Sequence, residues 1–203
     1  MTDTPATAPA TTAPAVTRHR IDATDIARVA VFAGIIAVLG LPGGFTIFGA
    51  VPITAQTLGV MLAGAVLGPW LGALSMTVFL GLVAIGLPLL SGGRGGLGVF
   101  VGPSAGYLIG FVVGALVIGL IVHAGRRKPT LWRTFTGIVV GGIVVVYAFG
   151  IPLQALITRL PLGETFLTSL VFLPGDLIKA VLATAITMTL LRAYPRAFRR
   201  TWR

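Results

Sequence analysis

The chain has 203 residues, of which 56% are hydrophobic and only 10% are charged, and its net charge at pH 7 is +10. A soluble domain carries about 25% charged residues, so five carboxylates and fifteen Lys and Arg side chains are too few to cover a water-facing surface. The composition therefore predicts an integral membrane protein. The basic residues stand between apolar blocks and at the two ends rather than along one face, which argues against nucleic acid as a partner.

Residues 1–25 differ in composition from the rest of the chain. They begin with MTDTPATAPATTAPAVT, which is mostly Thr, Ala and Pro and cannot bury enough apolar surface to fold. We expect a disordered cytoplasmic tail here, then a membrane domain over residues 26–192 and a basic cytoplasmic tail over residues 193–203.

The membrane domain contains apolar stretches of the length that a bilayer requires, roughly 20 residues each. In chain order, we expect spans at residues 26–41, 53–67, 70–90, 103–123, 133–158 and 174–192. The predicted fold class is an all-α integral membrane protein, a compact bundle of six transmembrane helices with both termini cytoplasmic.

The start of the last span has two interpretations. Pro174 has no amide hydrogen and suits the first turn of a helix, and a helix over residues 174–192 rises about 28 Å, nearly the thickness of the hydrocarbon core. In this interpretation, which we prefer, residues 165–173 form a separate apolar segment folded back into the protein. In the other, the helix begins at Thr165 and Pro174 only kinks it.

The basic residues of the connections indicate the orientation. If both ends are cytoplasmic, the inner side carries Arg18, Arg20, Arg28, Arg126, Arg127, Lys128, Arg133, Arg192, Arg196, Arg199, Arg200 and Arg203. The outer side carries only Arg94 and Arg159, and Lys179 lies inside the last span. This asymmetry matches the positive-inside rule and favours an even number of spans.

Two oppositely charged residues stand inside the last span. Asp176 and Lys179 each cost roughly 2.5–3.5 kcal/mol at the centre of a membrane helix, so we expect them to face the protein interior or a watery cavity. Three residues apart, they share one helix face. They form either a self-neutralising structural pair or a polar binding site. We favour the site, because two apolar residues would avoid the desolvation cost.

The loop SGGRGGLG at residues 91–98 lies on the predicted outer side. It contains a formal GxGxxG match, but it follows a membrane span and not a strand, so it does not indicate a dinucleotide site. Gly93 and Gly95 instead allow the backbone to turn and to approach a ligand closely. Arg94 is either a solvated charge or the partner of an anionic ligand.

Three further polar residues lie at the outer edge of the predicted spans. Thr54 and Gln56 open the second span, and Gln56 suits either an amide-like ligand or hydrogen bonds between helices. Tyr107 is either an interfacial anchor or a wall for a ring.

Several chemistries have no support in the sequence. No Gly-Lys dipeptide is present, so the chain has no GxxxxGK[ST] phosphate loop and cannot act as its own ATPase. Two histidines and no cysteine do not predict a transition-metal site, and we expect no cofactor. The sequence also has no GxSxG nucleophile motif.

Small residues recur at four-residue spacing in the predicted helices. The fourth span carries Gly102, Gly106, Gly110 and Gly114. Such ridges let helices approach closely in lipid, so we expect close packing within the bundle. Ala33 and Ala37 show the same spacing in the first span, where the small face could instead contact another membrane subunit.

The chain resembles the BioY family, the biotin-binding S components of energy-coupling-factor transporters, over about residues 27–192. The resemblance is carried by VPITAQTLGV at 51–60, the glycine-rich loop at 92–98, GPSAGYL at 102–108 and LPGDLIK at 173–179. It implies a six-helix fold in the bacterial cytoplasmic membrane that binds biotin from outside and associates with a transmembrane coupling subunit and two ATPase subunits.

The resemblance also implies roles for individual residues. Asp176 and Lys179 match the Asp and Lys that help to bind biotin in the family, and the loop around Arg94 matches a loop that lines the pocket. The small-residue face of the first span, here Ala33 and Ala37, matches the contact with the coupling subunit. The rival hypotheses are an S component for another vitamin, a non-transporting membrane subunit, and a small intramembrane enzyme that uses the charged pair as acid and base.

Overall fold

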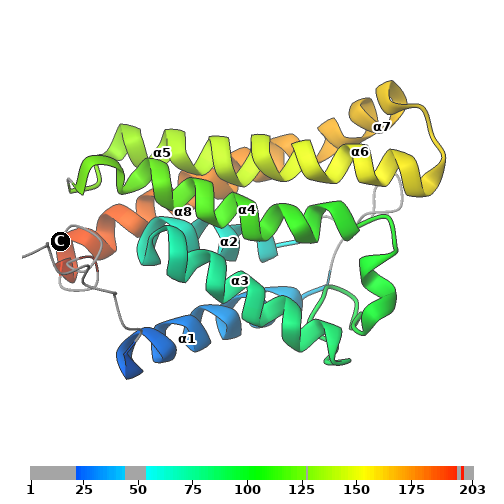
Figure 1. Ribbon diagram of the computed structural model, residues 1–203. Coiled ribbons are helices and arrows are strands. Elements are labelled where there is room, and N and C mark those ends of the chain that lie inside the picture. The colour runs from blue at the N-terminus through cyan, green and yellow to red at the C-terminus, as the bar shows by residue number, and fades with distance from the viewer. Residues whose placement is uncertain (1–21, 44–53, 127, 196–197, 199–203) are drawn as a thin grey trace, which may run out of the picture.

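The computed structural model describes residues 22–43, 54–126, 128–195 and 198 (Figure 1). Within these residues the regular structure is helical, apart from one isolated backbone pair between Leu90 and Arg94. The helices are α1 (Ala23–Gly40), α2 (Gln56–Leu67), α3 (Pro69–Ala84), α4 (Ala105–Val122), α5 (Leu131–Val139), α6 (Val146–Thr158), α7 (Leu162–Ser169) and α8 (Leu173–Ala193). Most of the predicted N-terminal tail, most of the predicted C-terminal tail and residues 51–53 of the VPITAQTLGV stretch lie outside the described residues.

Among the described residues, four helical stretches are long and apolar enough to cross a membrane. They are Ala23–Gly40, Ala105–Val122, Leu131–Thr158 and Leu162–Ala193. The apolar helices α2 and α3 are shorter, and the 12 residues of α2 rise only about 18 Å. The prediction of an all-helical membrane protein is therefore confirmed, while α2 and α3 are shorter than full spans.

Two of the predicted spans are shorter in the structure than expected. The third was expected to reach residue 90, but α3 ends at Ala84 and Gly86 follows with a positive φ of 105°, a conformation that a helix cannot contain. The fourth was expected to begin at residue 103, but α4 begins at Ala105. Gly102 therefore lies before the helix and does not belong to its small-residue ridge.

The start of α1 lies three residues before the predicted span. Asp22 and Asp25 form a capping box, in which each side chain accepts a hydrogen bond from the backbone amide of the other. Because this arrangement satisfies amide groups that the first turn leaves unpaired, the helix begins at Ala23. The last four residues of the predicted tail region thus cap and begin a helix.

The fifth span contains a wide turn that the sequence did not predict. Helices α5 and α6 are joined by a π-helical segment, Val140–Val145. Gly141 and Gly142 lie in it, and a Cβ added to Gly141 would stand 2.6 Å from the Gly114 carbonyl oxygen. Because a π turn holds more residues than an α turn, it rotates the faces of α6 relative to those of α5.

Pro174 lies in the first turn of the last helix, as the preferred interpretation predicts. Helix α8 begins at Leu173 with Pro174 in its first turn, and its 21 residues rise about 31 Å, one hydrocarbon thickness. The segment before it forms α7 and a single 3-10 turn, Leu170–Phe172. This segment is itself helical and joins α8 through an unbroken helical backbone, so the expectation of a separate segment folded back into the protein is wrong.

Helix α4 lies at the middle of the bundle, with α6 along one side and α3 along the other (Figure 1). A Cβ added to Gly110 would stand 3.0 Å from the Val146 Cα, and one added to Gly114 would stand 2.6 Å from the Gly141 carbonyl oxygen. The predicted close packing of this ridge is therefore confirmed. The start of α1 and the end of α8 lie at the same end of the molecule (Figure 1).

Candidate functional site

The charged pair of α8 lies against two other helices. Lys179 Nζ is 2.9 Å from Asp176 Oδ1, and the Asp176 side chain is only 5% exposed. Thr57 of α2 donates its hydroxyl to Asp176 Oδ1 at 3.2 Å, and Tyr147 of α6 donates to Oδ2 at 2.8 Å. We call Thr57, Tyr147, Asp176 and Lys179 the Asp176 cluster. The expectation that both charges face the protein interior and not lipid is confirmed.

The Lys179 ammonium uses all of its donors within the protein. Besides Asp176 Oδ1, it donates to the Thr57 hydroxyl at 2.9 Å and to the Thr54 carbonyl at 2.6 Å. An ammonium group has three N–H donors, so a ligand that accepts from Lys179 must replace one of these partners. The Lys179 side chain is 17% exposed, which leaves it more accessible than its partner carboxylate.

A second polar cluster lies beside the first and is neutral. The Tyr107 hydroxyl donates to Gln154 Oε1 at 2.9 Å and lies 3.2 Å from the Ser169 hydroxyl. We call these three residues, which come from α4, α6 and α7, the Tyr107 cluster. All three are buried, so Tyr107 is not an anchor at the membrane surface. Its ring meets the Tyr147 ring edge-on at a centroid distance of 6.4 Å, which joins the two clusters.

Gln56 connects helices in this structure. It is 2% exposed, and its amide nitrogen donates to the carbonyl oxygens of Leu89 at 3.1 Å and Ile36 at 3.4 Å. These bonds tie the start of α2 to α1 and to the loop after α3, as the second interpretation of Gln56 expects. Thr54 accepts the Gln56 backbone amide through its hydroxyl at 3.3 Å, and its carbonyl holds Lys179.

Arg94 organises its own loop. Its Nε donates to the Ser91 carbonyl and its Nη1 to the Ser104 hydroxyl, both at 3.2 Å. Gly93 has a positive φ of 69°, which favours glycine. Gly95 has no room for a side chain, because an added Cβ would overlap the Leu87 carbonyl. The hydrogen bonds of Arg94 within the described residues stay in this loop and at the start of α4, and none joins it to the Asp176 cluster.

The small residues of α1 do not all face outward. Ala33 is 3% exposed and packs in the chain's own core, and Ala37 packs against that core. Ala33 therefore presents no surface to a second subunit in this structure, which corrects the expectation for this residue. The Ala and Gly residues that α1 exposes are Ala23, Ala27, Ala30 and Gly34, and nothing lies within 4 Å of a Cβ added to Gly34.

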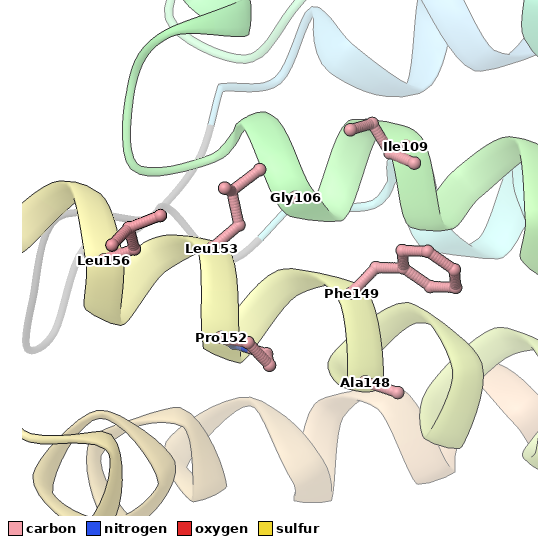
Figure 2. A pocket seen from close by; sticks show the side chains of 7 residues that line it. All are labelled: Gly106, Ile109, Ala148, Phe149, Pro152, Leu153 and Leu156. Carbon is pink, nitrogen blue, oxygen red and sulfur yellow. The ribbon is translucent and has the colours of Figure 1, made fainter.

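An apolar hollow of about 310 Å³ lies between α4 and α6 (Figure 2). It is lined by Gly106, Ile109, Ala148, Phe149, Pro152, Leu153 and Leu156. None of these side chains carries a charge or a hydrogen-bonding group, so the hollow offers nothing that would orient a polar ligand. Within the described part of the chain, no three His, Cys, Asp or Glu residues are grouped to hold a metal ion.

Thr57 and Tyr147 are the members of the Asp176 cluster that were not among the predicted site residues. Tyr147 is the one phenol of a long apolar span, and a buried tyrosine hydroxyl usually finds a polar partner. That signal could have marked it as a partner for the charged pair. Its direction, however, depends on the π turn that precedes it, which the sequence pattern did not indicate.

The chain is similar in sequence to proteins of known function. A sequence model described as the BioY family matches residues 12–196. The chain is 46% identical over 177 residues to the biotin transporter BioY of Rhizobium etli, covering 84% of this chain and 95% of that protein. It is 47% identical over 170 residues to the probable biotin transporter BioY of Bacillus subtilis, covering 83% and 91%.

The fold also matches a solved structure, the S-component for biotin from an ECF-type ABC transporter. The TM-score is 0.79 at 34% sequence identity, and the match covers 83% of this chain and 91% of that one.

Proposed function

Because this chain belongs to the BioY family, we propose that it is a high-affinity S component that captures biotin on the outer face of the membrane and delivers it inward with an ATP-driven coupling module. The observation that carries the proposal is the Asp176 cluster. It keeps two charges away from lipid at the start of α8, and a purely structural pair would gain nothing over apolar residues of similar size.

The chemistry of the cluster suits biotin. The ureido ring has N–H donors and one carbonyl, and the side chain ends in a carboxylate. A carboxylate such as Asp176 has about four acceptor positions. Within the described residues Oδ2 accepts a hydrogen bond from Tyr147 alone, so it can still accept a ureido N–H. Lys179 can exchange the Thr54 carbonyl for the carbonyl or the carboxylate of the ligand.

The other predicted site residues have supporting roles in this proposal. Gly93 and Gly95 shape the loop that approaches the ligand, and Arg94 holds that loop against the start of α4 or meets the carboxylate of biotin. Tyr107 packs edge-on against the Tyr147 ring and so helps to hold that ring in place. Gln56 fixes the start of α2, which places the carbonyl of Thr54, two residues earlier, where Lys179 needs an acceptor.

We place the chain in the bacterial cytoplasmic membrane with six traversals and both ends inside. The positive-inside distribution of Arg and Lys supports this orientation, as does the position of the start of α1 and the end of α8 at one end of the bundle (Figure 1). The chain has no cysteine, so a single introduced thiol reports the side of one position. In intact cells, an impermeant maleimide should label Glu164→Cys and not Lys128→Cys, and the reverse pattern would overturn this orientation.

For transport, we propose that the chain associates with a transmembrane coupling subunit and two ATPase subunits. The sequence has no phosphate loop, so the energy of ATP hydrolysis has to come from another chain. We place the contact on α1, where Ala30 and Gly34 form an exposed small-residue face that another helix can approach closely.

A thermal-unfolding panel of vitamins tests the proposed ligand. A ligand that binds only the folded state raises its stability by about 2.7 kcal/mol at a concentration of 100 times Kd. We expect biotin to raise the unfolding temperature of the purified protein and to have much less effect on Asp176→Asn. Stabilisation by another vitamin and not by biotin would assign the chain to that vitamin, and no response to any vitamin would favour a non-transporting subunit.

A further inference from the structure

The Thr57 hydroxyl contacts both charges of the candidate site at once. It donates to Asp176 Oδ1 at 3.2 Å and accepts from Lys179 Nζ at 2.9 Å. Among the described residues, no other side chain is hydrogen-bonded to both members of the pair, since Tyr147 reaches only Asp176. The bridge also comes from a different helix, because Thr57 is on α2 and the pair is on α8.

We propose that Thr57 is a positioning residue for the ligand site, and that its hydroxyl sets the direction in which Asp176 and Lys179 face the bound molecule. This inference rests on the proposed function. A hydroxyl has one donor and two acceptor positions. The Thr57 hydroxyl donates its hydrogen to the Asp176 carboxylate and accepts a hydrogen bond from the Lys179 ammonium through an oxygen lone pair. Each charge is therefore held in a defined place relative to the other.

The position of Thr57 suits this role. A Thr side chain has one principal torsion, and branching at Cβ restricts it, whereas a Lys side chain loses about 2 kcal/mol of rotamer entropy when it is held in one place. Most residues of α2 are buried, and the neighbouring Gln56 ties the helix to α1 and to the loop after α3. A stiff side chain on an anchored helix therefore orients a flexible one.

The bridge also fixes the plane of the carboxylate. Thr57 and Lys179 hold Oδ1, and Tyr147 holds Oδ2. A carboxylate held at both oxygens presents its remaining lone pairs in fixed directions. A site ordered before the ligand arrives loses less freedom on binding, so its affinity is higher. Removing the Thr57 hydroxyl is thus expected to weaken ligand binding more than it lowers the stability of the fold.

Biotin affinity of the full-length purified protein tests the inference with two substitutions at one position. Thr57→Val keeps the shape and removes both hydrogen bonds, and Thr57→Ser keeps the hydroxyl. We expect Kd for biotin to rise about tenfold or more in Thr57→Val and to stay within about threefold of wild type in Thr57→Ser. Thr77→Val is the matched control, because the Thr77 hydroxyl is exposed and bonds only the Ala73 carbonyl of its own helix.

A second ligand separates positioning from a general packing defect. Biotin methylated at a ureido nitrogen lacks one N–H donor, so wild type is expected to bind it more weakly than biotin. The quantity to compare is the Kd for methylated biotin divided by the Kd for biotin. If Thr57 positions Asp176, this ratio is expected to be about fivefold or more lower in Thr57→Val than in wild type. A defect in packing would weaken both ligands equally and leave the ratio unchanged, and that result overturns the inference. If Thr57→Val does not fold, Thr57→Ala is measured in the same way.

The outcomes also separate this inference from the proposed function. Wild-type affinity in Thr57→Val, together with loss of binding in Asp176→Asn, overturns the role of Thr57 and leaves biotin capture standing. Absence of biotin binding by the wild-type protein overturns both.

Discussion

The two polar clusters between the helices differ in charge and in exposure, although their tyrosine rings are only 6.4 Å apart. The Tyr107 cluster is neutral, all three of its residues are buried, and Tyr107 is hydrogen-bonded to both Gln154 and Ser169. The Asp176 cluster holds two full charges, and Lys179 is partly exposed. A neutral, closed cluster is sufficient to hold helices together in lipid. A charged and partly open cluster costs desolvation energy, which a bound ligand can justify.

Removing the carboxylate is expected to have the largest effect of the changes considered. Asp176→Asn leaves Lys179 with no counter-charge and takes a charged acceptor from three donors. Losing one member of a buried charge pair costs about 2–5 kcal/mol, so Kd for biotin is expected to rise about 100-fold or more, as measured by radiolabelled binding. Glu164→Gln is the control, because Glu164 is exposed on α7. Equal affinity of Asp176→Asn and wild type would place the ligand elsewhere.

Removing the ammonium is expected to have a smaller effect. Lys179→Met keeps most of the apolar stem, and Asp176 still accepts from Thr57 and Tyr147. We expect Kd for biotin to rise about 30-fold, which corresponds to about 2 kcal/mol. Isothermal titration against Lys128→Met, at an exposed lysine, measures the difference. A larger loss in Lys179→Met than in Asp176→Asn would reverse the assigned order of importance.

The two tyrosines allow a direct comparison of the clusters. Tyr147→Phe removes a hydrogen bond to a charged carboxylate, worth about 1.5–3 kcal/mol, so Kd for biotin is expected to rise about tenfold or more. Tyr107→Phe removes a bond between neutral groups and is expected to lower the unfolding temperature while changing Kd by less than about threefold. Titration and thermal unfolding of both variants provide the test. Weaker binding in Tyr107→Phe alone would mean that the neutral cluster contacts the ligand.

The smallest effect is expected at the edge of the Tyr107 cluster. In Ser169→Ala, Tyr107 keeps its bond to Gln154, so the free energy of unfolding is expected to fall by only about 0.6–1 kcal/mol. Biotin affinity is expected to stay at the wild-type value. Ser75→Ala is the control, because the buried Ser75 hydroxyl bonds only the Leu71 carbonyl of its own helix. Thermal unfolding in detergent compares the two, and a clear loss of affinity in Ser169→Ala would contradict the division between the clusters.

Much of the fold could be predicted because it depends on local rules. Apolar stretches of sufficient length predicted helices, and proline chemistry placed Pro174 in the first turn of α8. Glycines at four-residue spacing predicted the close contacts of Gly110 and Gly114. Each of these features follows from residues near one another in the chain.

The direction of Ala33 could not be predicted in the same way. A hydrophobic helix in lipid is apolar on all sides, so its sequence does not say which face the bundle buries. Ala33 has the same small side chain as Ala30, yet one lies in the core and the other on the surface. Which of them is buried depends on the helices that pack against α1.

The sequence by itself determined that a charged pair stands in a membrane helix and avoids lipid, because the cost of an unpaired charge in hydrocarbon depends on residue type alone. Only the tertiary structure decided which groups surround that pair. Thr57 lies on a helix more than a hundred residues earlier in the chain, and the π segment before Tyr147 turns that residue toward Asp176. Such contacts depend on the relative rotation of packed helices, which no local pattern of residues specifies.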